Sequence, residues 1–153
     1  MDHETVLELF ERYGDMVYRI ALSYLRSPQE AEDVVQTVFL KLLEGSVVAH
    51  TGKERSYLAK VTINRCKDLL RSARRYVDTP LEELALLAPP EEQDLFRAMM
   101  ELPEKYRVVV ALHYLAGYSF REIAQILHMS PSAVSMRLHR ARGILKQQLG
   151  RDQ

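Results

Sequence analysis

The chain has 153 residues, 47% of them hydrophobic, and its 21 Lys and Arg side chains are matched by 21 Asp and Glu side chains. This hydrophobic content excludes a chain that is disordered throughout, and the length allows one ordinary domain or two small ones. No apolar run is long enough to span a bilayer, and the N-terminal MDHETVLELF is acidic where a signal peptide is basic. We therefore expect a soluble, cytoplasmic protein without membrane insertion.

The neutral total is the sum of unlike segments. Residues 1–75 carry 12 basic and 11 acidic side chains. Residues 76–94 carry no basic and 6 acidic side chains, and residues 95–153 carry 9 basic and 4 acidic side chains. The segment charges are therefore +1, −6 and +5. This division predicts an N-terminal domain over 1–75, an acidic flexible linker over 76–94 and a basic C-terminal domain over 95–153.

Helical spacing of apolar residues recurs along the first domain, where the alternation typical of strands is absent. The spacing predicts a helix over 4–25, and Ser27 followed by Pro28 predicts the capped start of a second helix. A third helix is expected over 55–75, after a loop over 44–54. The residues expected to be buried are Val6, Phe10, Tyr13, Val17, Ile20 and Tyr24, then Ala31, Val34, Val35, Val38 and Leu42, and finally Leu58, Val61, Ile63, Cys66 and Leu69.

Prolines at positions 80, 89 and 90 argue against a long helix in the acidic segment, which favours a linker. Two helices are then expected over 95–102 and 104–116. Beyond them, Ser119 and Glu122 form the pattern of a capping box, and the sequence HMS predicts a turn before the next helix starts at Pro131.

A short helix, a tight turn and a second helix with a narrow apolar seam are typical of a helix-turn-helix motif. The sequence therefore predicts an all-α fold of two small helical domains joined by the acidic linker.

The last helix has two unlike sides. At about 100° per residue, Val134, Leu138 and Ala141 fall on one side, where they form the seam. The other side combines short polar groups with long cations, which suits close approach to a DNA major groove and pairing with guanine or phosphate. The alternative is an ordinary solvated basic surface. The candidate DNA-contacting residues are Ser132, Ser135, Met136, Arg137, His139 and Arg140.

The third helix concentrates a second group of cations. A cationic stripe follows phosphates and makes binding depend on salt. Asn64 offers both a donor and an acceptor to a base edge, although an ordinary surface amide is the alternative. The candidate residues of this second surface are Lys60, Asn64, Arg65, Lys67 and Arg71.

Three segments resemble one family of transcription factors. LPEKYRVVVALHYLAGYSFREIAQILHMSPSAVSMRLHRARGIL resembles the domain with which extracytoplasmic-function (ECF, group 4) sigma factors of the sigma-70 family bind the promoter −35 element. AEDVVQTVFLKL resembles the segment with which sigma factors bind the clamp helices of the largest RNA polymerase subunit, and RSYLAKVTINRCKDLLR resembles their helix at the −10 element. The positions that match the −35 domain are Leu102, Pro103, Arg107, Gly117, Ser119, Glu122, Ile123, Ala124, Ser130, Val134, Arg137, Leu138, Arg140, Ala141 and Arg142.

The resemblance implies a region 2 helical bundle over 1–75 and a region 4 helix-turn-helix domain over 95–153. It implies a protein that binds core RNA polymerase, directs initiation through −10 and −35 promoter elements and is controlled by an anti-sigma factor. It places Asn64 at a base of the −10 element. The implied polymerase contacts are Asp33, Gln36, Thr37 and Phe39, with Thr37 standing where the family usually has an acidic residue.

No nucleotide-binding loop, catalytic triad or metal-ligand cluster is found in the sequence, so we expect no enzyme activity, cofactor, metal or small-molecule substrate. Two alternatives stay open. A stand-alone helix-turn-helix regulator would bind DNA by itself, typically as a dimer, and the clamp-like segment argues against it. A sigma-like adaptor would bind polymerase or an anti-sigma factor without initiating transcription, and Thr37 leaves this alternative open.

Overall fold

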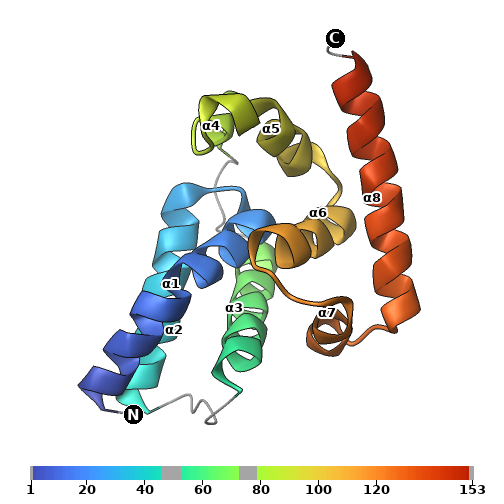
Figure 1. Cartoon of the computed structure of the whole chain (residues 1–153). Helices are drawn as coiled ribbons and strands as arrows, with labels where there is room; N and C mark the ends of the chain where they lie inside the picture. Colours follow the sequence, from blue (N-terminus) through green and yellow to red (C-terminus); the bar gives the residue numbers. More distant parts are fainter. Residues whose placement is uncertain (1, 46–52, 73–78, 152–153) are drawn as a thin grey trace. The chain divides into compact units, whose positions relative to one another are not determined.

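The computed structural model describes residues 2–45, 53–72 and 79–151, and the chain divides into two units, residues 1–76 and 77–153. Every regular element of the described residues is a helix (Figure 1), which confirms the predicted all-α fold. Within these residues no helix is long and apolar enough to cross a membrane.

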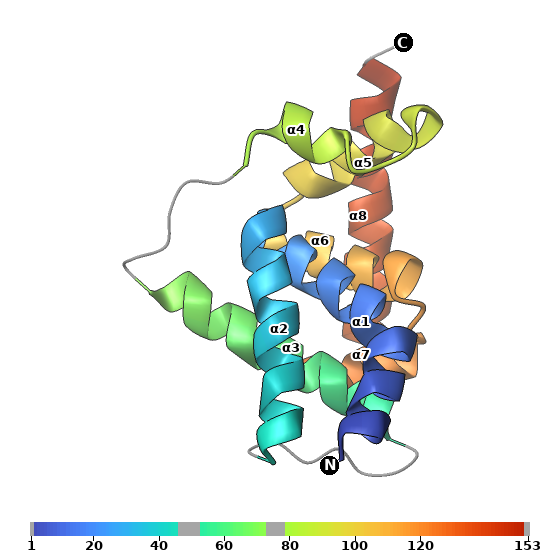
Figure 2. The same ribbon diagram turned by 90° about the vertical axis from the view of Figure 1, so that its left-hand side faces the viewer.

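The N-terminal unit is a bundle of three helices, α1 (His3–Leu25), α2 (Pro28–Glu44) and α3 (Glu54–Arg71), each packed against the other two (Figure 2). The α2 start confirms the predicted cap, because the Ser27 side chain accepts a hydrogen bond from the Glu30 amide at 3.3 Å. The helix ends at Gly45, whose φ of 75° lies in the left-handed region that glycine adopts without strain. The loop predicted over 44–54, after this helix, falls largely outside the described residues.

The core of this unit differs from the prediction at five residues, most clearly at Phe10. Phe10 was expected to be buried and is 47% exposed. On the same helix Leu9 and Met16 are buried, which turns the buried side of α1 so that Phe10 lies at its edge. Four other residues predicted as core are only partly buried: Tyr13, Val35, Val61 and Leu69.

The C-terminal unit contains the predicted helix-turn-helix motif. Helices α5 (Gln93–Glu101) and α6 (Glu104–Val110), the latter continued by a π-helical turn over Ala111–Leu115, are followed by α7 (Phe120–Leu127) and α8 (Pro131–Arg151). The motif's two predicted caps are confirmed. Ser119 and Glu122 form a reciprocal capping box, and Ser130 accepts from the Ala133 amide at 3.1 Å.

The acidic segment is not the predicted flexible linker over its described part. It forms α4 (Leu81–Ala85) and a 3₁₀ turn (Pro90–Glu92), and α4 packs against α5. Leu84 is fully buried, and Arg97 of α5 lies 3.2 Å from Glu82. The one helical turn is too short for its apolar residues to show a helical period in the sequence. Residues 76–78 of the predicted linker lie outside the described residues.

Substitution of two leucines of the acidic segment tests this packing. We expect Leu84→Ala to lower the free energy of unfolding by about 2–4 kcal/mol, because it leaves a cavity under α4. The matched change Leu86→Ala removes a side chain that is 70% exposed and should change stability by less than about 0.5 kcal/mol. Chemical denaturation of the full chain measures both, and equal small effects would show that residues 81–85 are not packed.

Candidate nucleic-acid interface

One side of α8 is exposed and carries most of the residues predicted to contact DNA. Val134, Leu138 and Ala141 are buried against the rest of the C-terminal unit, as the helical period predicted. Arg137 is half-buried beside this seam. The other five predicted residues project from the exposed side of the helix: Ser132, Ser135, Met136, His139 and Arg140.

The side chains of this α8 face suit contact with base edges in a DNA groove better than contact with a flat acidic surface. Met136, 54% exposed, lies between the serines and the two larger polar side chains. The serines let the helix backbone approach base edges, and an exposed thioether can contact a thymine methyl group. Arg140 supplies a planar set of donors for a base or a phosphate.

The exposed side of α3 carries four of its five predicted residues. Lys60, Asn64, Lys67 and Arg71 follow one another at steps of four, three and four residues, and all are exposed. Such spacing places them on one stripe of the helix. Asp68 lies 3.8 Å from Arg71 and offsets part of its charge. The remaining three positions of this stripe carry two cations and an amide, a combination that follows phosphates and reaches a base edge.

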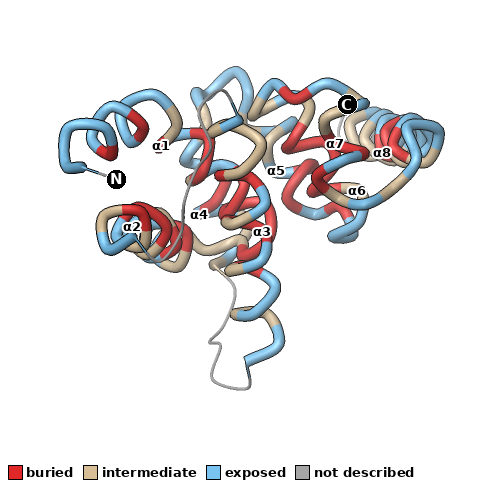
Figure 3. The backbone as a smooth tube through the Cα atoms, turned by 90° about the horizontal axis from the view of Figure 1, so that it is seen from below, coloured by how far each residue is buried: buried red, intermediate tan, exposed pale blue. Residues whose placement is uncertain are grey.

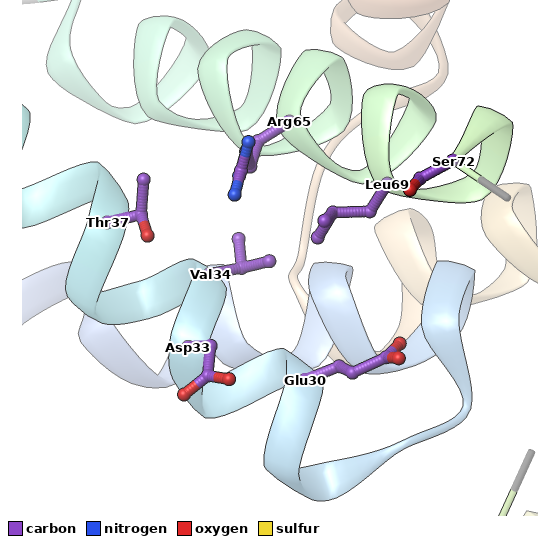
Figure 4. Close-up of a pocket in the computed structure, with 7 residues that line it drawn as sticks. All are labelled: Glu30, Asp33, Val34, Thr37, Arg65, Leu69 and Ser72. Carbon is purple, nitrogen blue, oxygen red and sulfur yellow. The ribbon is translucent and has the colours of Figure 1, made fainter. Parts of the chain in front are cut away.

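The fifth predicted residue of α3, Arg65, points elsewhere. Its side chain projects into a cavity of about 200 Å³ between α2 and α3, next to Val34, Thr37 and Leu69 (Figure 4). Its Nε is buried without a hydrogen-bond partner. The structure thus groups Arg65 with α2, and not with the cations on the exposed stripe of α3.

The candidate polymerase residues of α2 fall on different sides of the helix. Asp33 and Gln36 are exposed and Thr37 is half-buried beside the Arg65 cavity. Phe39 is only 6% exposed, because the ring of Phe10 from α1 covers it edge-to-face at 5.2 Å between centroids. The structure therefore separates Phe39 from the exposed polar stripe to which the resemblance assigned it.

Two arginines of the helix-turn-helix pattern have partners inside the protein. Arg107 is 5% exposed and donates from Nη1 to the Leu102 carbonyl oxygen at 2.8 Å, which closes the turn between α5 and α6. Arg142 donates from Nε to the Tyr114 hydroxyl at 2.8 Å, with its guanidinium 5.6 Å from the ring centroid. Sequence reasoning missed the contact between Arg142 and Tyr114, because the two residues are 28 positions apart along the chain and Tyr114 lies on the π-helical turn.

Two groups of the N-terminal unit, on α1 or at its start, have shifted pKa values. Hydrogen bonds from Thr5 lower the pKa of the Asp2 carboxyl, which caps the N-terminus of α1. Burial, followed by the nearby charge of Glu32, raises the pKa of Tyr18. Among the residues that the structure describes, no group of three or more His, Cys, Asp and Glu side chains is placed to hold a metal ion.

Two family models match the chain. Sigma-70 region 2 matches residues 9–76, and Sigma-70, region 4 matches residues 92–145. The ECF RNA polymerase sigma factor SigM of Mycobacterium tuberculosis is 30% identical over 149 residues, which cover 94% of this chain and 76% of the relative. The RNA polymerase sigma factor SigV of Bacillus subtilis is 28% identical, over 88% of this chain and 85% of the relative.

Two solved structures have a similar fold. CnrH in complex with the cytosolic domain of CnrY aligns with a TM-score of 0.73 and 26% identity, over 99% of this chain and 92% of that chain. The sigma factor RpoE of Bartonella quintana, in complex with the anti-sigma factor NepR, aligns with a TM-score of 0.70 and 21% identity, over 98% of this chain and 99% of that chain.

Arginine-to-methionine substitutions separate the surroundings of the buried Arg107 from those of the half-buried Arg65. We expect Arg107→Met to lower the free energy of unfolding by about 1–3 kcal/mol, because the buried Leu102 carbonyl loses its charged donor. Arg65→Met keeps the apolar stem between α2 and α3 and removes the buried Nε donor that has no hydrogen-bond partner, so stability should be unchanged or higher. Denaturant titration measures both, and a comparable loss for Arg65→Met would mean that its guanidinium stabilises the bundle.

Proposed function

Because the chain belongs to the ECF RNA polymerase sigma factors of the sigma-70 family, we propose that it binds core RNA polymerase and directs initiation through two exposed helix faces that contact promoter DNA. Members of this family are transcription initiation factors and not enzymes. The observation that carries the proposal is the α8 face, an exposed side of short polar and cationic groups on the second helix of a helix-turn-helix motif.

The proposed contact of α8 is the −35 element. Ser132, Ser135, Met136, His139 and Arg140 are the exposed side chains available to base edges and flanking phosphates. Arg137, half-buried beside the seam, would reach only the backbone at the border of the site. Since Met136 presents an exposed thioether at the centre of this face, we expect a preference that includes contact with a thymine methyl group.

The proposed contact of α3 is the −10 element. Lys60, Lys67 and Arg71 would follow the phosphates, and Asn64 lies among them with a donor and an acceptor for one base. Arg65 is left out of this proposed surface, because its side chain is directed into the cavity beside α2.

The proposed polymerase contact is the exposed stripe of α2 that carries Asp33 and Gln36, with Thr37 at its border. An acidic residue and an amide on an exposed helix suit the cationic and polar groups of a protein partner, which in this family is the clamp of the largest polymerase subunit. Phe39 would act indirectly, as the buried support of this part of α2.

Control by an anti-sigma factor is the last part of the proposal. It is supported by the two similar structures, which are complexes: CnrH with the cytosolic domain of CnrY, and the sigma factor RpoE with the anti-sigma factor NepR. We expect a purified anti-sigma partner to abolish run-off transcription that depends on this chain. Transcription by the same polymerase with another sigma factor should not change, and inhibition of both would point to an effect on the polymerase.

Substitution of Arg140 tests the function and the α8 face together. In run-off transcription with core polymerase and genomic promoter fragments, the chain should give specific starts, and Arg140→Ala should reduce them about fivefold or more by removing a contact worth about 1–3 kcal/mol. Binding to core polymerase should not change, because Arg140 lies on the other unit from α2.

The matched control is Arg97→Ala, which removes an exposed cation of α5 that already pairs with Glu82 and Glu101. This variant should initiate like the unmodified chain. If the unmodified chain binds polymerase and gives no specific start at any promoter fragment, the chain is an adaptor and the proposal is wrong.

A further inference from the structure

Three large apolar side chains lie exposed on the outer side of the N-terminal bundle. Leu7 is 58% exposed, Phe10 47% and Leu40 53%. Leu7 and Phe10 belong to the first turns of α1, and Leu40 belongs to the last turns of α2, which lie at the same end of the antiparallel helix pair (Figures 1 and 2). Figure 3 shows that the outer side of these first turns of α1 is exposed.

Phe10 marks the line along which the two helices meet. Its ring packs edge-to-face on Phe39 with 5.2 Å between the centroids, and its other neighbour is Gly14, where an added Cβ would lie 3.5 Å from the Phe10 ring. The ring is therefore held in place by α1 and α2 together while nearly half of it stays in solvent. Leu7 precedes Phe10 by three residues and lies beside it on the same helix.

Leu40 extends the exposed polar stripe of α2. It follows Gln36 by four residues and Asp33 by seven, so that the three side chains project from one side of the helix. An apolar residue more than half exposed thus continues the stripe that carries the proposed polymerase contacts, and it does so toward the end of the bundle where Phe10 lies.

The surroundings of these apolar residues are acidic. Exposed carboxylates occur at Glu4, Glu8 and Glu11 on α1 and at Glu44 on α2. Single exposed leucines are normal on protein surfaces, but three large apolar groups from two helices, bordered by these four carboxylates and by the fewer cations Arg12 and Lys41, are typical of a surface that binds another protein. Such a surface fits a partner with apolar side chains flanked by lysine or arginine.

We propose that Leu7, Phe10 and Leu40 extend the polymerase-binding surface from α2 onto α1, and that Phe10 makes the aromatic contact that the resemblance assigned to Phe39. The inference rests on the proposed function, since it names further contacts of the same polymerase surface. Phe39 then acts as a positioning residue, because it supports the Phe10 ring from below and is itself covered. The partner surface is an apolar patch of core polymerase with cationic neighbours.

The test is the affinity of the full chain for purified core polymerase, measured by competition with a fluorescently labelled copy of the unmodified chain. We expect Leu7→Ser, Phe10→Ser and Leu40→Ser each to weaken binding about fivefold or more, as the loss of a buried contact at an interface does. Leu86→Ser is the matched control, because Leu86 is 70% exposed and lies on the other unit. The affinity of this variant for core polymerase should not change.

Two further variants separate this inference from the proposed function. Asp33→Ala and Gln36→Ala remove only the proposed polar contacts of α2. If they weaken binding while Leu7→Ser and Leu40→Ser bind like the unmodified chain, the apolar extension is wrong and the α2 surface stands. If neither group weakens binding, the proposed α2 surface is wrong as well. Leu7 and Leu40 are exposed, so their variants remain informative even if Phe10→Ser unfolds.

Discussion

Because α8 buries only a narrow seam, its remaining side chains are held outward in a fixed order, and the helix-turn-helix motif depends on this one-sided burial. Val134, Leu138 and Ala141 are small enough for α8 to lie close to its neighbours, yet they are fully covered. The capping box at Ser119 and the cap at Ser130 fix where α7 and α8 begin, and His128 with a φ of 57° turns the chain between them. A seam one residue wider would bury part of the polar face, and a narrower one would leave α8 without enough contact to hold its direction.

Three arginines that look alike in the sequence have different surroundings in the structure. Arg107 is buried and holds the Leu102 carbonyl, Arg142 donates to Tyr114, and Arg140 is exposed. Arginine supports each arrangement because its charge is permanent and its planar donors suit a carbonyl, a hydroxyl or a phosphate equally well. The matched pattern around the helix-turn-helix therefore mixes residues that build the domain with residues that are exposed on its surface. Only the position relative to the buried seam and the presence of an internal acceptor separate the two groups.

The sequence predicted the all-α fold and the exposed side of α8 well because both depend on local information. Helical period, caps at Ser27 and Ser119 and the turn after α7 are written in residues a few positions apart. The sequence-based prediction failed where the surroundings of a residue depend on a partner that is distant along the chain. Phe10 fits the apolar spacing of α1, and only the packing of α2 shows that it lies over Phe39 instead of inside the core. Leu84 lies among acidic residues and prolines, and its burial depends on α5, so composition pointed to a linker. Arg65 belongs to a cationic helix in the sequence, but its place on the helix directs it toward α2.

The packing of α4 changes how the charge of the C-terminal unit has to be understood. The acidic residues that follow position 80 belong to the same unit as α8, so that unit as a whole is not basic. DNA binding by this unit therefore depends on where its positive and negative side chains lie. Gln148 donates to Glu101 of α5 at 3.1 Å, which places α5 beside the C-terminal end of α8. The exposed face around Met136 lies about 18 Å from that point along the helix, at 1.5 Å per residue. This separation exceeds the screening length of about 8 Å at physiological salt, so the carboxylates near α5 repel a phosphate at the α8 face only weakly. The length of α8 thus allows one small unit to carry carboxylates near one end of this helix and the proposed DNA-binding face near the other.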